Sequence, residues 1–234
     1  MTKDHGKLYV LDARTATDHF PGIGRYVSNL AQAMAGELDD NERLLLLVDT
    51  SQPTRWKLPH DSKQVQHVST AVSPFSLTQQ WLIPGLLQQH QATIYHSPYY
   101  LMPYRPTIPT ILTVYDVIPQ LFPDYFTART RLLANMSTWL ALRRADHLLT
   151  ISAATRQDVL AKYAIKAEKL TTIPLAPDPH FTPQSRTVVE EMHQKYQLPA
   201  NYVLYLGINK PHKNLVRLVE AWAQADRPLD LKDF

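Results

Sequence analysis

Short apolar segments alternate with longer amphipathic segments along most of this chain, and this alternation restricts the fold more than any other feature. The expected strands are Leu8–Asp12, Leu44–Asp49, Gln64–Ser69, Thr93–Ser97, Thr110–Tyr115, His147–Ile151 and Leu170–Ile173. The expected helices are Ile23–Leu38, Leu77–Gln89, Phe126–Arg144 and Ser152–Tyr163, the last with a serine that can cap it. Residues 44–48 are apolar without alternation, as in strands covered on both faces. The pattern predicts an α/β fold with a mostly parallel sheet.

A proline-rich segment separates this series from a second, shorter one. Pro174, Pro177, Pro179 and Pro183 follow the last strand of the series and indicate a linker. A helical pattern over Val188–Tyr196 leads to a further strand, loop and helix from Tyr202 onward. We therefore expect a first domain over 1–180, a linker and helix over 181–200, and the start of a second domain over 201–234.

Composition excludes several classes of protein. The excess of 24 basic over 21 acidic residues gives a net charge of only +3, too small and dispersed for a nucleic-acid partner. The chain has no cysteine, which fits a reducing compartment such as the cytoplasm and rules out thiolate chemistry. Neither a signal-peptide core nor an apolar run long enough to cross a bilayer is present in the sequence.

Polar and aromatic residues follow two expected strands at the edge where open α/β sheets bind ligands. His96, Tyr99 and Tyr100 follow the strand that ends at Ser97, and Tyr115 and Asp116 follow Val114. These side chains can form a rim that binds a sugar, or they can pack in ordinary turns. Asp116 can accept hydrogen bonds from substrate hydroxyls or cap the next turn. The sequence leaves both alternatives open.

A glycine-containing segment, Pro21-Gly-Ile-Gly-Arg-Tyr26, opens the first long helix. Gly22 and Gly24 allow close approach of a ligand to the backbone, and a helix N-terminus favours negative charge. The segment is not a G-x-G-x-x-G fingerprint, because position 27 is valine. An ordinary glycine-assisted helix start is the competing interpretation.

A cationic turn lies between the strand at Tyr202 and the helix that begins near Asn214. Lys210, His212 and Lys213 cluster there, where helix N–H groups and the helix dipole also favour a phosphate-bearing ligand. Metal ligation is not expected, because the histidines lack H-x-x-x-H spacing and no D-x-D pair ends a strand. Charge on a leaving phosphate must then be met by cationic side chains.

Taken in order, the motifs resemble the family-4 retaining glycosyltransferases of GT-B fold, also called group 1 glycosyltransferases. The matching segments are Gly22–Tyr26, His96–Pro98, Thr113–Pro119, Ala145–Ser152, Ile173–Asp178 and Tyr202–Leu215. Each is weak alone, and six in the correct order make a specific pattern. Members similar to this branch are often mannosyltransferases of polysaccharide or lipopolysaccharide assembly.

The resemblance implies two Rossmann-like domains, of which the first holds the acceptor and the second the nucleotide-sugar. It implies retaining transfer without a metal or other cofactor. The residues that it assigns to donor binding are Gly22, Gly24, Arg25, His212, Lys213 and Asn214. The residues that it places on the acceptor side are His96, Tyr99 and Tyr115. It gives catalytic roles to Asp116 and to Lys213, which would stabilise the diphosphate leaving group.

Three departures from the family pattern stand out. Many members carry histidine where this chain has Tyr115, and the family's Arg-Lys-Asn motif here begins with His212, which is only partly charged near neutral pH. The family's E-x7-E pair, which contacts the donor, does not occur in residues 1–234. We therefore expect only the first β-α unit of the second domain, and little or no activity from residues 1–234 alone.

The predicted function is transfer of a hexosyl group, mannosyl by resemblance, from a nucleotide-sugar to a glycan or lipid-linked acceptor. The first alternative is a non-catalytic acceptor-binding module or relic that needs a partner chain. A dinucleotide oxidoreductase is disfavoured, because the glycine pattern is wrong and Asp49, the one acidic candidate at the end of the second strand, lacks a convincing ribose-binding context. Self-association through the second-domain segment also stays open.

Three aromatic residues bear on membrane contact. Trp81, Trp139 and Tyr125 lie in or next to expected helices. Because aromatic residues at helical spacing usually pack in the core, we expect these three to do so. Peripheral contact with the inner face of a membrane is the alternative.

Overall fold

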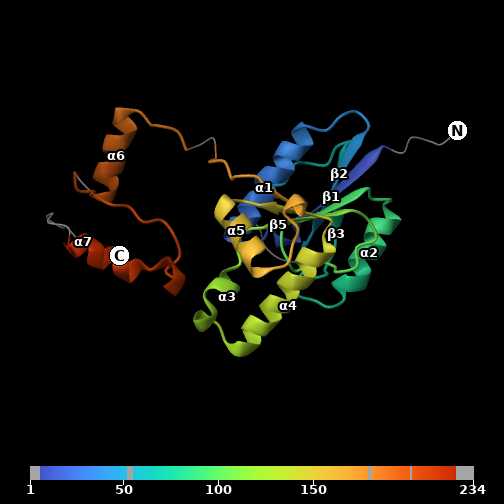
Figure 1. Cartoon of the computed structure of the whole chain (residues 1–234). Helices are drawn as coiled ribbons and strands as arrows, with labels where there is room; N and C mark the ends of the chain where they lie inside the picture. The colour runs from blue at the N-terminus through green and yellow to red at the C-terminus, as the bar shows by residue number, and fades with distance from the viewer. Residues whose placement is uncertain (1–5, 52–54, 179–180, 201, 225–234) are drawn as a thin grey trace. The chain divides into compact units, whose positions relative to one another are not determined.

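The computed structural model describes residues 6–51, 55–178, 181–200 and 202–224. The chain divides into two compact units, Met1–Leu175 and Ala176–Phe234, which are called unit 1 and unit 2 below (Figure 1). The division follows Leu175, whereas the sequence places the end of the first domain at residue 180. Each unit is described by itself.

Unit 1 is built on a parallel sheet of seven strands, as the sequence predicts. The strands are β1 (Lys7–Asp12), β2 (Glu42–Val48), β3 (Val65–Ser69), β4 (Ile94–Ser97), β5 (Thr110–Val114), β6 (His147–Thr150) and β7 (Leu170–Thr172). Their order is β3-β2-β1-β4-β5-β6-β7, and every neighbouring pair is parallel. This is the doubly wound arrangement of a Rossmann-like domain.

The strand order changes direction between β1 and β4. Strands β2 and β3 follow β1 toward one edge of the sheet, and β5 to β7 follow β4 toward the other. Leu11 of β1 lies beside His96 of β4 in the parallel register. Ligands of open α/β sheets bind beyond the carboxyl ends of the strands at such a switch point. The ends of β1 and β4 are therefore where a site is expected.

Helices cover both faces of the sheet, and most of them match the sequence prediction (Figure 1). They are α1 (Pro21–Gly36), α2 (Gln79–Gln89), α4 (Ala128–Arg144) and α5 (Ala153–Lys162). Ser152 caps α5 as predicted, because its hydroxyl accepts a hydrogen bond from the Thr155 N–H at 3.1 Å. The short helix α3 (Ile118–Leu121) was not predicted.

Two hydrophobic clusters form the core of unit 1. In one, Val27 and Ala31 of α1 pack against buried leucines of β1 and β2. In the other, residues of α2, α4 and α5, among them Leu87, Leu142 and Val159, pack with the strands. The central strands thus bury both faces, which explains why residues 44–48 are continuously apolar.

Unit 2 contains the helices α6 (Arg186–Tyr196) and α7 (Leu215–Gln224) and the 3-10 turn η4 (Pro211–Lys213). The strand expected from Tyr202 is not formed: residues 202–206 belong to no ladder. A β-strand needs a neighbouring strand for its backbone hydrogen bonds, and the described part of unit 2 supplies none. The ring of Tyr202 instead meets that of His193 of α6, with centroids 5.8 Å apart.

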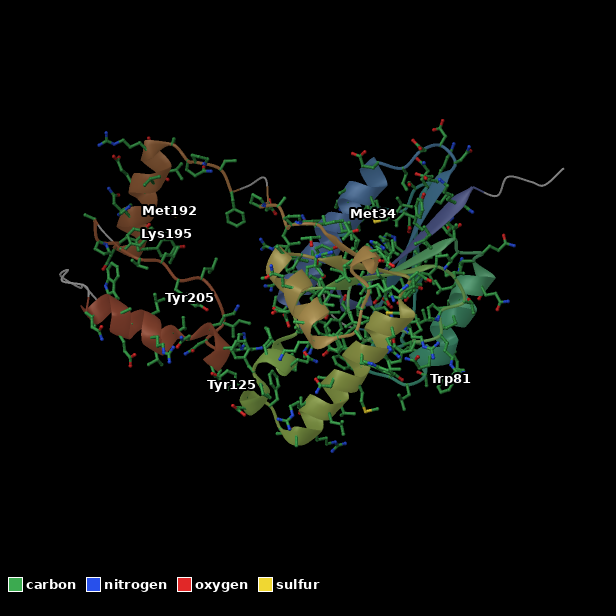
Figure 2. All side chains as sticks on the ribbon, viewed as in Figure 1. Met34, Trp81, Tyr125, Met192, Lys195 and Tyr205 are labelled. Carbon is green, nitrogen blue, oxygen red and sulfur yellow. The ribbon has the colours of Figure 1, made fainter. Side chains whose placement is uncertain are left out.

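Three aromatic residues that the sequence favours as core lie at the surface. Trp81 is 72% exposed, Trp139 46% and Tyr125 51%, so the preference for core packing was wrong. Figure 2 shows Trp81 and Tyr125 at the periphery of unit 1. Helical spacing alone does not say which side of a helix meets the sheet. In the part of the chain that the structure describes, no helix has the length and apolar character needed to cross a bilayer.

Candidate functional site

A buried ion pair occupies the switch point at the end of β1. The Asp12 carboxylate accepts hydrogen bonds from Arg14 Nε at 2.8 Å and Arg14 Nη2 at 2.6 Å, and a third from the Tyr95 hydroxyl at 2.5 Å. Arg14 is 1% exposed, and it also donates to the carbonyl of Val72 and to Gln79 Oε1. The network therefore ties the loop after β1 to β4, to the loop after β3 and to α2.

The charges of this pair stabilise each other. Burial alone would raise the pKa of Asp12, but the adjacent Arg14 guanidinium and the donated hydrogen bonds hold that pKa below its usual value. Burial by itself would lower the pKa of Arg14. The charge and hydrogen bonds of Asp12 outweigh this effect, so the pKa of Arg14 is raised. Sequence analysis missed this pair, although a D-x-R sequence directly after a buried strand was a usable signal.

His96, an expected acceptor-side residue, lies at the end of β4 and is buried. Its Nε2 is 2.8 Å from Thr113 Oγ1 on β5, and the same hydroxyl is 3.2 Å from the hydroxyl of Tyr26 on α1. Burial lowers the pKa of His96 to about 4. The imidazole is therefore neutral near pH 7, and it takes part in a hydrogen-bonded row that crosses from β4 to α1.

Tyr115 continues this row. Its ring meets that of Tyr26 edge to face, with centroids 5.4 Å apart. Burial, and to a smaller extent Tyr26, raise the pKa of Tyr115. Its hydroxyl is buried and has no hydrogen-bond partner among the described residues. Such a group is normally satisfied by water or a ligand.

Tyr99 belongs to an aromatic group that comes from three loops at the same edge of the sheet. His19 and Phe20 follow β1, Phe75 follows β3, and Tyr99 follows β4. The rings of Phe20 and Phe75 stack with centroids 5.8 Å apart, and Phe20 lies 5.3 Å from Tyr99. Phe75 is 61% exposed, so part of this apolar surface faces solvent. We refer to these four residues as the aromatic rim.

Asp116 follows β5 and is exposed. Its Oδ1 accepts a hydrogen bond from the Ile118 N–H at 3.0 Å, so the carboxylate caps the turn before α3. Burial, then Tyr100, and finally the charge of Asp116 raise the pKa of Tyr99. Asp116 is therefore within electrostatic reach of the aromatic rim. Of the two roles left open by the sequence, the structure shows the capping role.

The two glycines of α1 have different surroundings. A Cβ on Gly24 would lie 2.2 Å from Trp56 Nε1, whereas a Cβ on Gly22 would meet nothing within 4 Å. Gly24 thus admits the Trp56 indole, whose N–H donates to the carbonyl of Thr17 at 3.2 Å. Arg25 lies over the same indole, with Cζ 5.8 Å from the ring centroid. Packing therefore explains Gly24, while Gly22 leaves the first turn of α1 open.

No side chain caps the N-terminus of α1, where Phe20 is the capping residue and Pro21 follows. The first N–H groups of a helix without such a cap can bind an anion or water. Gly22 in this turn is exposed. The geometry is compatible with the expected approach of a phosphate group.

The cationic turn of unit 2 is exposed, apart from His212, which is half-buried. The Lys213 N–H donates to the carbonyl of Lys210 at 2.8 Å, which closes η4. Asn214 then adopts a left-handed conformation with φ 53°, and α7 starts at Leu215. The predicted turn and helix are therefore present, with Lys213 on an open surface.

The predicted site residues fall into two sets. Unit 1 brings His96, Tyr99, Tyr115, Asp116 and the start of α1 to one edge of its sheet. Unit 2 carries His212, Lys213 and Asn214 on one turn. Across the described ranges, no group of three or more histidine, aspartate or glutamate residues is arranged to hold a metal ion.

This chain is similar to known glycosyltransferases. The model of Glycosyltransferase Family 4 matches residues 21–181. The O-antigen chain mannosyltransferase B of Escherichia coli is 28% identical over 137 residues, which cover 58% of this chain and 36% of that protein. The O-antigen chain mannosyltransferase RfbU of Salmonella typhimurium is 28% identical over 115 residues, or 47% and 28% of the two chains. The matches thus span about a third of these relatives.

Solved structures show the fold. The crystal structure of Anabaena Alr3699/HepE in complex with UDP-glucose superposes with a TM-score of 0.63 and 18% identity, over 94% of this chain and 58% of that one. The complex of the same protein with UDP and glucose gives a TM-score of 0.62. At this identity the likeness concerns the GT-B architecture.

Proposed function

The chain belongs to glycosyltransferase family 4, and from this premise we propose that it supplies the acceptor side of a retaining, metal-independent glycosyltransferase. The proposed reaction transfers a hexosyl group, most simply mannosyl, from a nucleotide-sugar to a glycan or lipid-linked acceptor. The names of the mannosyltransferase relatives support the sugar, and the UDP-glucose bound to the Anabaena protein supports a nucleotide-sugar donor. The observation that carries the proposal is the aromatic rim at the switch point of the sheet.

The aromatic rim suits a sugar acceptor. Phe20, Phe75 and Tyr99 offer flat apolar faces, and sugar rings present C–H groups to such faces while their hydroxyls form hydrogen bonds. The Tyr99 hydroxyl donates to that of Tyr100 at 3.1 Å. The Tyr115 hydroxyl, which has no hydrogen-bond partner among the described residues, is a further group that can bond a ligand. Apolar surface and polar groups thus converge at one edge.

Asp116 has the chemistry to orient sugar hydroxyls. It is an exposed carboxylate at the end of β5, and its Oδ1 accepts one backbone hydrogen bond at 3.0 Å. A carboxylate has more acceptor sites than this one bond uses. We assign it to hydrogen bonding with the reacting sugars, in addition to capping its own turn.

Lys213 is assigned to the leaving group. In retaining transfer the bond between the anomeric carbon and the phosphate oxygen breaks, and the acceptor oxygen bonds to the same face. The acceptor proton passes to the departing phosphate. Negative charge grows on the diphosphate, and a cation there lowers the barrier without a metal. His212 adds charge when protonated. In unit 1, taken by itself, Gly22 and the uncapped N-terminus of α1 offer N–H groups to a phosphate.

Residues 1–234 alone are proposed to transfer little or no sugar, since the family's E-x7-E pair does not occur in them. The test is a transfer assay with a panel of radiolabelled nucleotide-sugars and a glycan acceptor mixture. It compares residues 1–234 with a protein extended beyond residue 234. Robust transfer by residues 1–234 would contradict this proposal, and transfer by neither protein would contradict the family activity.

Acceptor binding is tested on residues 1–234 themselves. Saturation-transfer NMR with mannose oligosaccharides should detect binding that Phe75→Ala and Tyr99→Ala weaken roughly tenfold, as expected for lost stacking contacts. Trp81→Ala is the control, because Trp81 is an exposed aromatic residue on α2 that does not belong to the aromatic rim. Binding that responds equally to all three changes would argue against a site at the aromatic rim.

A non-catalytic acceptor-binding module is the second candidate. It is favoured by the position of the aromatic rim wholly within unit 1. The exposed apolar residues of unit 2, such as Leu206 at 90% exposure, offer a surface for a partner chain or for self-association. Sequencing downstream of the Phe234 codon separates the two candidates, since an E-x7-E segment there supports the enzyme.

The proposed setting of the reaction is the cytoplasm, with peripheral contact at the inner face of the membrane. The absence of cysteine fits a reducing compartment. A lipid-linked acceptor would require the enzyme to approach a membrane surface.

A further inference from the structure

Helix α4 presents an apolar stripe to solvent. The stripe consists of Leu132 (60% exposed), Leu133 (55%), Met136 (52%) and Trp139 (46%). Their spacing of one, three and three residues places them on one side of an α-helix. We refer to these four residues as the α4 stripe.

The α4 stripe is opposite the buried side of the helix. Thr138, Ala141 and Leu142 are the buried residues of α4, and the last two belong to the hydrophobic core. At about 100° per residue they lie on the other side of the helix axis from the stripe. Figure 1 shows α4 on the outside of unit 1. The sheet therefore uses one side of α4 and leaves the apolar stripe uncovered within unit 1.

Positive charge surrounds the α4 stripe. Arg129 and Arg143 stand at its two ends on the same side of the helix, and Arg131 and Arg144 add two further charges. The sequence of α4, ARTRLLANMSTWLALRR, contains no aspartate or glutamate. The guanidinium of Arg143 lies over the Trp139 ring, with Cζ 4.9 Å from the centroid. The helix thus combines an exposed apolar face with positive charge that no acidic residue of the helix itself offsets, although the exposed Asp124 lies in the turn before it.

The turn before α4 also exposes apolar rings. Phe122 and Tyr125 stack with centroids 5.8 Å apart and are 39% and 51% exposed. Figure 2 shows Tyr125 in the segment that leads from α3 to α4. Tyr125 has a ring with one polar end, which is typical of the interface between lipid and water, and Phe122 adds apolar surface.

We propose that α4 and the turn before it bind an anionic phospholipid surface, with the α4 stripe in the interfacial layer and the arginines on the headgroups. This inference rests on the proposed function, because membrane contact would serve transfer to a lipid-linked acceptor. It assigns that contact to one helix and the turn before it. Charge complementarity selects the occupant. A helix with four arginines and no acidic residue is attracted to anionic lipid. An apolar protein partner would leave the arginines unmatched.

The test is co-sedimentation of residues 1–234 with vesicles of phosphatidylglycerol and phosphatidylcholine in equal parts, and with vesicles of phosphatidylcholine alone. We expect binding to the anionic vesicles, with weaker binding at high salt. Arg129→Gln with Arg143→Gln should reduce that binding roughly tenfold or more. The control is Arg43→Gln with Lys63→Gln, an exposed cation of β2 and one just before β3, which changes the net charge equally.

A second pair of variants tests whether the α4 stripe or the exposed apolar residues of unit 2 bind the vesicles. Leu132→Gln with Leu133→Gln should reduce vesicle binding roughly tenfold, because two leucines leave the interface. Leu204→Gln with Leu206→Gln, which are 71% and 90% exposed in unit 2, should leave it unchanged. Circular dichroism checks that each variant is folded.

Several results would overturn the proposal. One is equal binding to both kinds of vesicle, and another is loss of binding with the unit 2 variant only. A third is self-association, detected by light scattering, that the α4 variants abolish. Glycan binding is measured on the same variants. If vesicle binding is found without glycan binding, the proposed function fails and the lipid surface stands. If glycan binding is found without vesicle binding, the lipid surface fails and the proposed function stands.

Discussion

Unit 1 and unit 2 show how the same kind of sequence behaves with and without neighbouring strands. Residues 44–48 of β2 and residues 202–206 of unit 2 are both short apolar runs. The first lies between two parallel strands, and Leu44 and Leu46 are completely buried. The second forms no ladder, and Leu204 is 71% exposed. Strand propensity is therefore satisfied only where a partner backbone exists.

The ion pairs of the two units differ in the same way, one being buried and the other exposed. Arg14 and Asp12 of unit 1 form a buried pair with further hydrogen bonds around it. Arg186 and Glu190 of α6 form an exposed pair at 2.8 Å, with the Arg186 side chain 93% exposed. Burial, rather than the distance between the charges, decides what each pair contributes.

The largest expected effect comes from breaking the buried pair. Arg14→Met leaves the Asp12 carboxylate buried without its cation, and we expect a loss of about 3–5 kcal/mol in the free energy of unfolding. Urea denaturation followed by circular dichroism measures it. Arg186→Met is the matched control in unit 2 and should have no measurable effect. Similar losses in both variants would remove the contrast between the units.

The next effect compares two leucines. Leu46→Ala in β2 removes a completely buried side chain and should cost about 2–5 kcal/mol. Leu206→Ala, at 90% exposure, should change stability by less than about 0.5 kcal/mol. Hydrogen exchange measured by mass spectrometry assigns each change to its unit. A large effect of the Leu206 variant would indicate that unit 2 has a packed core.

A third test sharpens the comparison within unit 1, at the two glycines of α1. Gly24→Ala forces a Cβ into the Trp56 indole and should destabilise the unit by about 1–3 kcal/mol. Gly22→Ala meets open space and should be neutral or slightly stabilising. Thermal unfolding measures both. Combining Gly24→Ala with Trp56→Ala should give a smaller loss than the sum of the single changes, and strict additivity would contradict the contact.

The smallest effect is a pH dependence from His96. Its folded pKa of about 4 lies below the unfolded value, so the unfolded state binds more protons between these values and stability falls as the pH falls. Lowering the pH from 7.5 to 5.5 should cost the native protein roughly 1 kcal/mol more than it costs His96→Gln. His193→Gln in α6 is the control and should behave like the native protein. Equal pH dependence in all three would show that His96 is not buried in solution.

The candidate site was predictable in part. His96 and Asp116 were expected because parallel strands bring their carboxyl ends to one edge, and both lie at the ends of β4 and β5. The reason for Gly24 was not predictable, since Trp56 reaches it from a segment 32 residues later in the chain (56 minus 24). The aromatic rim joins loops after β1, β3 and β4, and only the strand order makes these loops neighbours.

The sequence by itself determined most of the strand and helix pattern of unit 1, the parallel sheet and the family, because periodicity and motif order are properties of local residue choice. Tertiary structure alone decided which apolar residues became core. Leu142 and Trp139 lie on one helix, yet the sheet buries the first and leaves the second 46% exposed. The side of a helix that meets the sheet, and the partners that a strand finds, depend on contacts between segments far apart in the chain.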